Sequence, residues 1–220
     1  MTADHDAFFP PPGSVAPRGL PDFAGTERLW ERETERWTVK VLPGGCYVTR
    51  ADEAIVTVLG SCISACIRDP DTGLGGMNHF MLAEQLAGSK EHPDSGFSQI
   101  NRYGCFAMES LINHLLRHGA QRERLEIKVF GGGRILKSMT DIGARNIAFI
   151  HSWARTEGMR LLAQDLGGVQ PRKLIYFPAT GRARVRKLPP VESRSIADRE
   201  LNYLQYLIEE PGEGEVEFFT

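Results

Sequence analysis

The segment from residue 38 to residue 82 constrains the fold more than any other, because apolar and polar residues alternate in twos through most of it. A period of two is the period of a β-strand, in which successive side chains point to opposite faces of a sheet. Turn residues such as Pro43 and Gly44 interrupt the alternation. The segment therefore predicts a meander of strands. The expected strands are Val39–Val41, Tyr47–Thr49, Ala54–Leu59, Cys62–Ile67 and Gly76–Leu82.

Helical spacing follows the meander. Apolar residues recur at intervals of three and four over Gln99–His118, and Gly119 directly after them is a typical C-cap. Further helices are expected at Asn146–Glu157 and Ser193–Ile208, and further strands at Leu125–Phe130, Arg160–Gln164, Lys173–Pro178 and Ala183–Leu188. A strand meander combined with separate helices predicts an α+β fold.

A short helix is also predicted before the meander. Thr26 is a candidate N-cap, and Trp30 and Trp37 follow it one heptad apart. This spacing predicts a helix over Glu27–Trp37 whose two tryptophans pack on one face.

Both ends of the chain differ from its centre. Residues 1–23 hold five prolines, three of them consecutive, and proline prevents regular hydrogen bonding, so these residues are expected to form a disordered or draped arm. The domain itself is expected to span residues 24–188, and residues 189–220 a C-terminal helix and an acidic tail. No segment has the basic and apolar pattern of a signal peptide or the roughly 18 apolar residues of a membrane span. A cytoplasmic protein without membrane insertion is expected.

The charge balance and the cysteine count argue against two classes of protein, nucleic-acid-binding proteins and disulfide-rich secreted proteins. Lys and Arg number 26 against 28 Asp and Glu, which does not indicate binding to nucleic acid. Four cysteines in 220 residues are too few for a disulfide scaffold, and a reducing compartment leaves them as thiols. One of these thiols is therefore available as a nucleophile.

The turn sequence at residues 69–72 sets a register for the hairpin around it. Asp69 followed by Pro70 is typical of a type I turn, around which four-residue hairpin loops are built. If Arg68 faces Gly73 across this loop, residue 62 faces residue 79 on the neighbouring strand. Residue 62 is a cysteine and residue 79 a histidine. Opposed side chains lie on one face about 4.5–5.5 Å apart between Cβ atoms, so the turn predicts a thiol beside an imidazole.

This pair is open to three interpretations. An imidazolium lowers the pKa of a neighbouring thiol and creates a nucleophile, so Cys62 would be the activated cysteine. Cys62, Cys66 and His79 could instead share a metal, although their spacing is looser than that of usual zinc motifs. A buried cysteine packed near a histidine is the structural alternative. The turn residues Gly60 and Ser61 favour the nucleophile, because the backbone N–H groups of Ser61 and Cys62 could then bind an oxyanion.

Seven short motifs stand in a fixed order along the chain. They are LGSC (59–62), CIRDP (66–70), GGMNHFML (75–82), KVFGGG (128–133), DIGARN (141–146), QDLGG (164–168) and TGRARVRKL (180–188). This set resembles the CheD family, the chemoreceptor glutamine deamidases of bacterial chemotaxis, over about residues 42–188. The resemblance implies an α+β sandwich of sheets flanked by helices, as in toxin deamidases, a cysteine-hydrolase fold. It also implies Cys62 as the nucleophile and His79 as the general base, with no cofactor and no metal.

A third catalytic residue is implied less directly. The family is described with a threonine upstream of the cysteine that orients the imidazole, in some members six residues before it. Here that position holds Val56, and Thr57 lies five residues before Cys62. In an unbroken strand this odd separation places the two side chains on opposite faces, so Thr57 can take the role only if the chain bends at Gly60.

The resemblance implies that the protein converts selected glutamines of chemoreceptor cytoplasmic helices to glutamate through a thioester. The alternative is an adaptor that binds receptors or a CheC-family phosphatase and catalyses little. A transglutaminase or thiol protease would use the same acyl chemistry.

Three other features are weaker. Gly131–Gly133 lacks the rest of a phosphate loop, and the resemblance to the CheD family implies that it forms a turn near the site. A loop over Glu84–Gly96 could border the approach to the site. The residues Arg182, Arg184 and Arg186 line one strand face, either as a solvated face or as a docking surface for an acidic helix.

Overall fold

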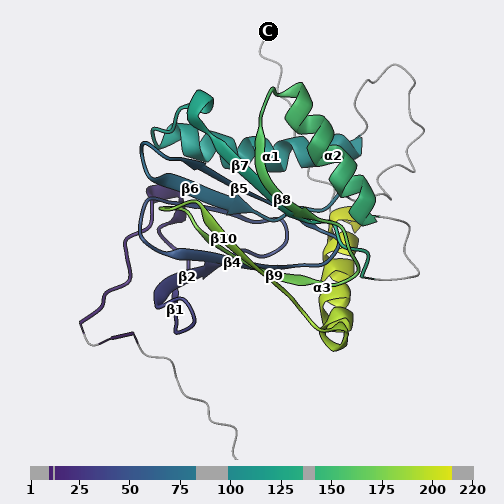
Figure 1. Cartoon of the computed structure of the whole chain (residues 1–220), viewed down its shortest axis with the longest axis horizontal. Coiled ribbons are helices and arrows are strands. Elements are labelled where there is room, and N and C mark those ends of the chain that lie inside the picture. Colours follow the sequence, from purple (N-terminus) through teal and green to yellow (C-terminus); the bar gives the residue numbers. More distant parts are fainter. Residues whose placement is uncertain (1–9, 12, 83–98, 136–141, 210–220) are drawn as a thin grey trace, which may run out of the picture.

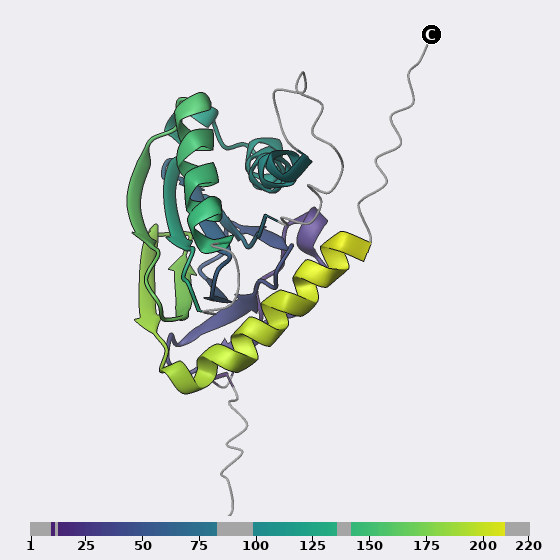
Figure 2. The ribbon, with the colours of Figure 1, turned by 90° about the vertical axis from the view of Figure 1, so that its right-hand side faces the viewer.

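Two five-stranded sheets pack face to face and carry helices on one outer face and across one end (Figures 1 and 2). The structure is a computed structural model, and it describes residues 10–11, 13–82, 99–135 and 142–209. This arrangement confirms the predicted α+β fold with a sandwich of sheets.

The two sheets take their strands from interleaved parts of the chain. The first sheet has the order β1 (Leu29–Glu31), β2 (Arg36–Lys40), β4 (Ala54–Leu59), β9 (Arg172–Phe177) and β10 (Arg182–Lys187). The second has the order β3 (Cys46–Thr49), β6 (Leu74–Asn78), β5 (Ile63–Asp69), β7 (Glu126–Gly131) and β8 (Leu161–Leu166). Neighbours are antiparallel except for β2 with β4 and β7 with β8.

Successive side chains of β5 point alternately into two different hydrophobic clusters. Its odd-numbered residues Ile63, Ala65 and Ile67 belong to the cluster formed with α1 (Gln99–Arg117) and α2 (Ile142–Thr156). Cys62 and Cys66 point the other way, into the cluster between the two sheets. Alternation therefore separates a helix-facing core from an inter-sheet core, as the period predicts.

The helix α3 (Pro190–Glu209) lies across the end of the sandwich and is drawn in yellow in Figure 2. It follows the hairpin of β9 and β10 directly in the chain. Its bounds extend the predicted helix Ser193–Ile208 by a few residues at its N-terminal end.

The predicted helix over Glu27–Trp37 is wrong, because β1 and β2 form a hairpin there. The chain reverses at residues 32–35, where the N–H of Thr34 bonds to the carbonyl of Glu31. Trp30 then pairs with Trp37 across the hairpin, with ring centroids 5.9 Å apart. The tryptophans pack together as expected. Their seven-residue spacing places them opposite each other across a hairpin, and not on one face of a helix two turns apart.

Several predicted segments fall partly or wholly outside the described residues. The loop Glu84–Gly96 and the acidic tail lie outside them, as does most of the segment 1–12. In the rest of the predicted arm, Phe23 packs against Tyr47 and against His114 of α1. The domain boundaries stay predictions. Among the residues that the structure describes, no helix has the length and apolar character that crossing a membrane requires.

Candidate active site

The turn of residues 60–62 carries the chain from β4 in the first sheet to β5 in the second. The carbonyl oxygens of its first and third residues accept hydrogen bonds from the N–H groups of Gly133 (2.7 Å) and Gly132 (2.8 Å). The carbonyl of the middle residue accepts one from Nδ2 of Asn146 in α2 (2.8 Å). The Gly131–Gly133 segment thus forms a turn against the site, as expected. Because all three carbonyls are held on one side, the three N–H groups are left to bind a common acceptor on the other.

That acceptor is the carboxylate of Glu200 in α3. Its Oε1 accepts hydrogen bonds from the N–H groups of Gly60 (2.8 Å) and Cys62 (3.3 Å). Its Oε2 accepts bonds from the N–H (2.8 Å) and the hydroxyl (2.6 Å) of Ser61. We call the three N–H groups of residues 60–62 the N–H nest. A nest that holds a carboxylate oxygen has the donors that a tetrahedral oxyanion needs.

Gly60 is required by the close approach of this carboxylate. A Cβ atom at residue 60 would lie 2.7 Å from Oε2 of Glu200 and 2.3 Å from Cδ1 of Ile135. Any side chain at this position would therefore displace the group bound to the nest.

The thiol of Cys62 lies beside the imidazole of His79, although the predicted register is wrong by two residues. Arg68 pairs with Gly75 rather than with Gly73, and Ile63 forms a bridge with Phe80. A shift of two keeps every side chain on its face, so Cys62 and His79 become diagonal rather than direct neighbours.

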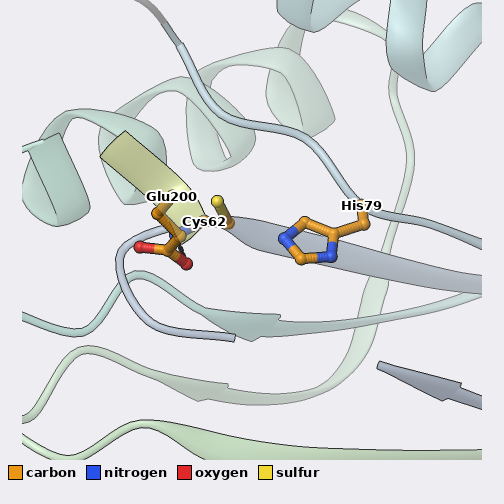
Figure 3. A group of neighbouring side chains, drawn as sticks. All are labelled: Cys62, His79 and Glu200. Carbon is orange, nitrogen blue, oxygen red and sulfur yellow. Dashed lines mark hydrogen bonds between the residues drawn. The ribbon is translucent and has the colours of Figure 1, made fainter. Parts of the chain in front are cut away.

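The distances confirm this proximity. The Cys62 sulfur, a ring nitrogen of His79 and a carboxylate oxygen of Glu200 all lie within 4.8 Å of one another (Figure 3). The carbonyl of His79 accepts a hydrogen bond from the N–H of Gly44, and its N–H donates one to the carbonyl of Gly45. These bonds fix the imidazole ring over the inter-sheet core.

The hydroxyl of Thr57 fixes the tautomer of His79. Its Oγ1 donates to the carbonyl of Val41 (2.8 Å) and lies 2.8 Å from Nδ1 of His79. A hydroxyl has one proton, and a carbonyl can only accept, so Nδ1 must carry the proton that binds Oγ1. Nε2 is then the basic nitrogen. It is buried and has no hydrogen-bond partner among the described residues.

Thr57 reaches His79 because the chain turns at Gly60, which is the condition that strand parity set. The parity argument assumed one continuous strand, whereas β4 and β5 belong to facing sheets. Thr57 therefore approaches the imidazole from across the inter-sheet core, while the imidazole itself follows β6 of the other sheet.

Burial keeps the Cys62 thiol and the His79 imidazole uncharged in this conformation, and the charge of Glu200 adds to the effect on the thiol. Burial and the Glu200 carboxylate raise the pKa of the Cys62 thiol well above its usual range. Burial lowers the pKa of His79 to about 4. The sequence led us to expect an imidazolium that lowers the pKa of the thiol. Here a protonated thiol instead faces a neutral imidazole at neutral pH.

The alternative metal site differs from the one predicted. The three potential ligands that lie together are Cys62, His79 and Glu200, and Cys66 is not among them. Both oxygens of Glu200 already accept hydrogen bonds from the nest. Zinc takes four protein ligands in structural sites and three in catalytic sites, so among the described residues this group has too few ligands for a structural zinc only. The donor set thus fits proton transfer and oxyanion binding better than metal coordination.

A small cavity borders the imidazole. It has a volume of about 40 Å³ and is lined by His79, Thr57, Ile196, Glu200 and residues 40–43, among others. A cavity of this size has room for about two waters. The structure thus has room for a water molecule beside His79.

Sequence reasoning missed two residues of the site. Asn146, at the end of the motif DIGARN, holds the turn through Ser61 and also accepts a bond from the N–H of Leu82. Glu200 lies on the buried face of α3 with Ile196 and Ala197. A carboxylate within the apolar face of a predicted helix was the available signal, because such a group is seldom buried without a partner.

A thiol, an imidazole with a free nitrogen and an N–H nest together define the site of a cysteine-dependent hydrolase of amide bonds. Comparison with known proteins identifies the family. Residues 81–187 match the family model described as CheD chemotactic sensory transduction. The chain is 48% identical over 207 residues to the probable chemoreceptor glutamine deamidase CheD of Halorhodospira halophila, which covers 94% of this chain and 96% of that protein.

Two further relatives have the same name. The protein of Hydrogenovibrio crunogenus is 52% identical over 184 residues, or 83% of this chain and 94% of that protein. The protein of Saccharophagus degradans is 48% identical over 202 residues, or 91% of this chain and 93% of that protein. The chain belongs to the CheD family.

Proposed function

We propose that this protein hydrolyses the side-chain amide of glutamines in chemoreceptors, producing glutamate and ammonia. The names of its relatives support the reaction and the substrate. The observation that carries the proposal is the unpartnered Nε2 of His79 beside the Cys62 thiol and the N–H nest.

The first half of the reaction forms a thioester. Nε2 of His79 takes the thiol proton, and the Cys62 sulfur attacks the carboxamide carbon. The charge on the carbonyl oxygen is stabilised by the N–H nest, in which the N–H of Gly60 joins those of Ser61 and Cys62. His79 then gives its proton to the departing nitrogen, which leaves as ammonia.

The second half restores the enzyme. His79 removes a proton from a water molecule, whose oxygen attacks the thioester carbon and displaces the Cys62 sulfur. The sulfur regains its proton, and the former glutamine leaves as glutamate. Thr57 keeps the Nδ1 proton in place, so that Nε2 serves as base in both halves. Proton transfer of this kind contributes about 10²–10⁴-fold to the rate.

The decisive experiment uses a chemoreceptor cytoplasmic fragment and mass spectrometry. Hydrolysis of an amide to an acid raises the mass by about 1 Da per glutamine. Cys62→Ala should lower the rate by at least about 10³-fold. Cys66→Ala is the matched control, because Cys66 lies on the same face of the same chain segment and is also buried. Activity of the Cys62→Ala variant equal to that of Cys66→Ala would disprove the proposal.

The same variant separates this function from its rivals. An adaptor that binds receptors or a CheC-family phosphatase would keep its function in Cys62→Ala. A thiol protease would cut the fragment, and a transglutaminase would join it to an amine. Binding to a CheC-family protein and a cytoplasmic location stay predictions.

A further inference from the structure

The candidate site is closed in this structure, and α3 closes it. The Cys62 and His79 side chains are 0% and 2% exposed, respectively. Glu200 occupies the N–H nest through three hydrogen bonds and accepts a fourth from the hydroxyl of Ser61. A glutamine from another molecule can reach neither the thiol nor the nest while Glu200 remains there.

The group that fills the nest is chemically the product of the proposed reaction. Glu200 is a glutamate side chain presented by a helix, and deamidation leaves a glutamate on a receptor helix. A carboxylate oxygen and the oxyanion of a tetrahedral intermediate need the same N–H donors. The nest is therefore filled by an internal copy of the group that the proposed reaction produces.

The remaining contacts of α3 allow it to leave. Ile196 and Ala197 are buried beside Glu200, and Tyr203 packs partly buried against the inter-sheet core. Most of the other described side chains of the helix are exposed, among them those of Asp198 and Arg199. The hydroxyl of Tyr203 also bonds to that of Tyr103 in α1. Among the side chains of α3 that the structure describes, few are both apolar and buried, which is typical of a segment with a low free energy of local opening.

The geometry argues against Glu200 as a member of the catalytic machinery. Nδ1 of His79 bonds to Thr57, so the position that a triad carboxylate would take is already filled. Both oxygens of Glu200 bind the donors that the oxyanion requires. The negative charge of Glu200 also raises the pKa of Cys62, which opposes formation of the thiolate.

We propose that α3 occupies the surface on which a receptor helix binds, with Glu200 in the place of the side chain being converted. The inference rests on the proposed function. The substrate helix and α3 then compete for the N–H nest, and binding of one requires release of the other. The surface next to α3 includes Leu42, a large apolar side chain that is 59% exposed and borders the cavity at His79.

The first test measures access to Cys62 without any receptor. Glu200→Ala removes the bonds to the nest, and a hydrogen bond to a charged group is worth about tenfold or more in an equilibrium. Alkylation of Cys62 by iodoacetamide should therefore accelerate at least about tenfold. Asp198→Ala is the matched control, because it removes an exposed carboxylate two residues away on the same helix. Deamidation of a receptor fragment should rise in Glu200→Ala and stay unchanged in Asp198→Ala.

The second test asks whether the side chain of residue 200 occupies the position of the substrate glutamine side chain. Glu200→Gln places a carboxamide on the nest beside Cys62. The sulfur should attack the amide carbon and release ammonia, and water should then cleave the thioester and restore the thiol. The purified variant should thus gain about 1 Da with time and become the original protein. The double variant Glu200→Gln with Cys62→Ala should keep its mass.

A third measurement needs no substitution. Hydrogen exchange of the backbone amides of α3 should accelerate when the receptor fragment is added to the unaltered protein, because the helix is displaced. This keeps the inference open to refutation even if a variant fails to fold.

The outcomes separate the inference from the proposed function. Unchanged Cys62 alkylation in folded Glu200→Ala, or protection of α3 that rises with the receptor fragment, would overturn the inference. So would faster alkylation with slower deamidation, because Glu200 would then be needed by the reaction. A stable mass in Glu200→Gln with a reactive Cys62 would also overturn it. If alkylation accelerates and the introduced carboxamide of Glu200→Gln is converted, but no form deamidates receptors, the closure of the nest by α3 stands and the proposed substrate fails.

Discussion

The helices α1 and α2 attach to the second sheet through large apolar side chains, whereas α3 attaches to the end of the sandwich largely through a carboxylate. The first two insert large apolar side chains, such as Met108, Leu111 and Ile150, into the core against β5. Among its described side chains, the third inserts Ile196, the small Ala197 and the Glu200 carboxylate, and packs the partly buried Tyr203 against the inter-sheet core. Two of these helices are therefore part of the core, whereas α3 is an attachment whose strongest bonds end in the candidate active site.

This difference has an energetic consequence. Burial of a large aliphatic side chain contributes about 1.5–3 kcal/mol, so removing α1 would expose several such contributions at once. Among the side chains that the structure describes, the docking of α3 depends on the buried Ile196 and Ala197, on the partly buried Tyr203, and on hydrogen bonds that water can replace. Stability of the fold is thus concentrated in one set of helices and control of the site in the other.

Truncating one buried residue in each kind of helix tests the comparison most strongly. Leu111→Ala in α1 should lower the free energy of unfolding by about 2–5 kcal/mol. Ile196→Ala in α3 should lower it by less than half as much, because the loss cannot exceed the free energy with which α3 docks. Urea unfolding measures both, and hydrogen exchange in α3 should accelerate in Ile196→Ala. Equal losses would show that α3 belongs to the core.

Acid should lower the free energy of unfolding, because His79 is buried as a neutral imidazole. Above pH 6.5 neither state binds a proton at this imidazole. Below it the unfolded chain gains a proton that the folded site accepts only near its pKa of about 4. Stability therefore falls as the pH drops from 6.5 to 4, by about 2 kcal/mol at pH 5.

Urea unfolding of His79→Asn at pH 7.5 and pH 5 measures this contribution. The variant should lose less stability between the two values than the unaltered protein. His151→Asn, which changes a half-buried histidine on α2, serves as the control. A parallel loss in His79→Asn and the unaltered protein would place the acid sensitivity elsewhere.

Thr57 should affect the reaction and leave α3 in place. Thr57→Val keeps the shape but removes the hydroxyl that accepts the Nδ1 proton of His79. The rate of receptor deamidation should fall about tenfold, because the imidazole loses its fixed tautomer. Thr57→Ser should restore most of the rate, and hydrogen exchange in α3 should be the same in all three proteins. Faster exchange in Thr57→Val would mean that the orientation of His79 and the docking of α3 are coupled.

The sequence argument predicted the thiol and imidazole pair although its register was wrong, because the face that each side chain takes depends only on strand parity. The loop at residues 70–73 differs from the predicted loop, and the register shifts by two. A shift of one would have separated Cys62 from His79, whereas a shift of two preserved the face. The predicted helix at Glu27–Trp37 failed because a seven-residue spacing also fits a hairpin with a four-residue turn.

Contacts between distant parts of the chain could not be predicted in this way. Glu200 meets the nest across about 140 residues of sequence, and no local pattern encodes that meeting. The contact of Thr57 with His79 was expected only on the condition of a bend at Gly60, and the strand pattern by itself did not show that this bend joins two facing sheets. Local periodicity specifies which face a side chain takes, but the packing of layers decides which faces meet.

The interleaved order of the strands determines the smallest unit that could carry this chemistry. Thr57, Cys62 and His79 all lie within about 25 residues of one another in the chain. Yet β4 is flanked by β9, and β5 by β7, both supplied by later parts of the sequence. A peptide limited to the catalytic segment would expose both edges of β4 and one edge each of β5 and β6, and it would lose the partners that hold the turn. Transplanting this reaction into another protein would require the whole sandwich through β9, with α3 as the only described helix that could be redesigned independently.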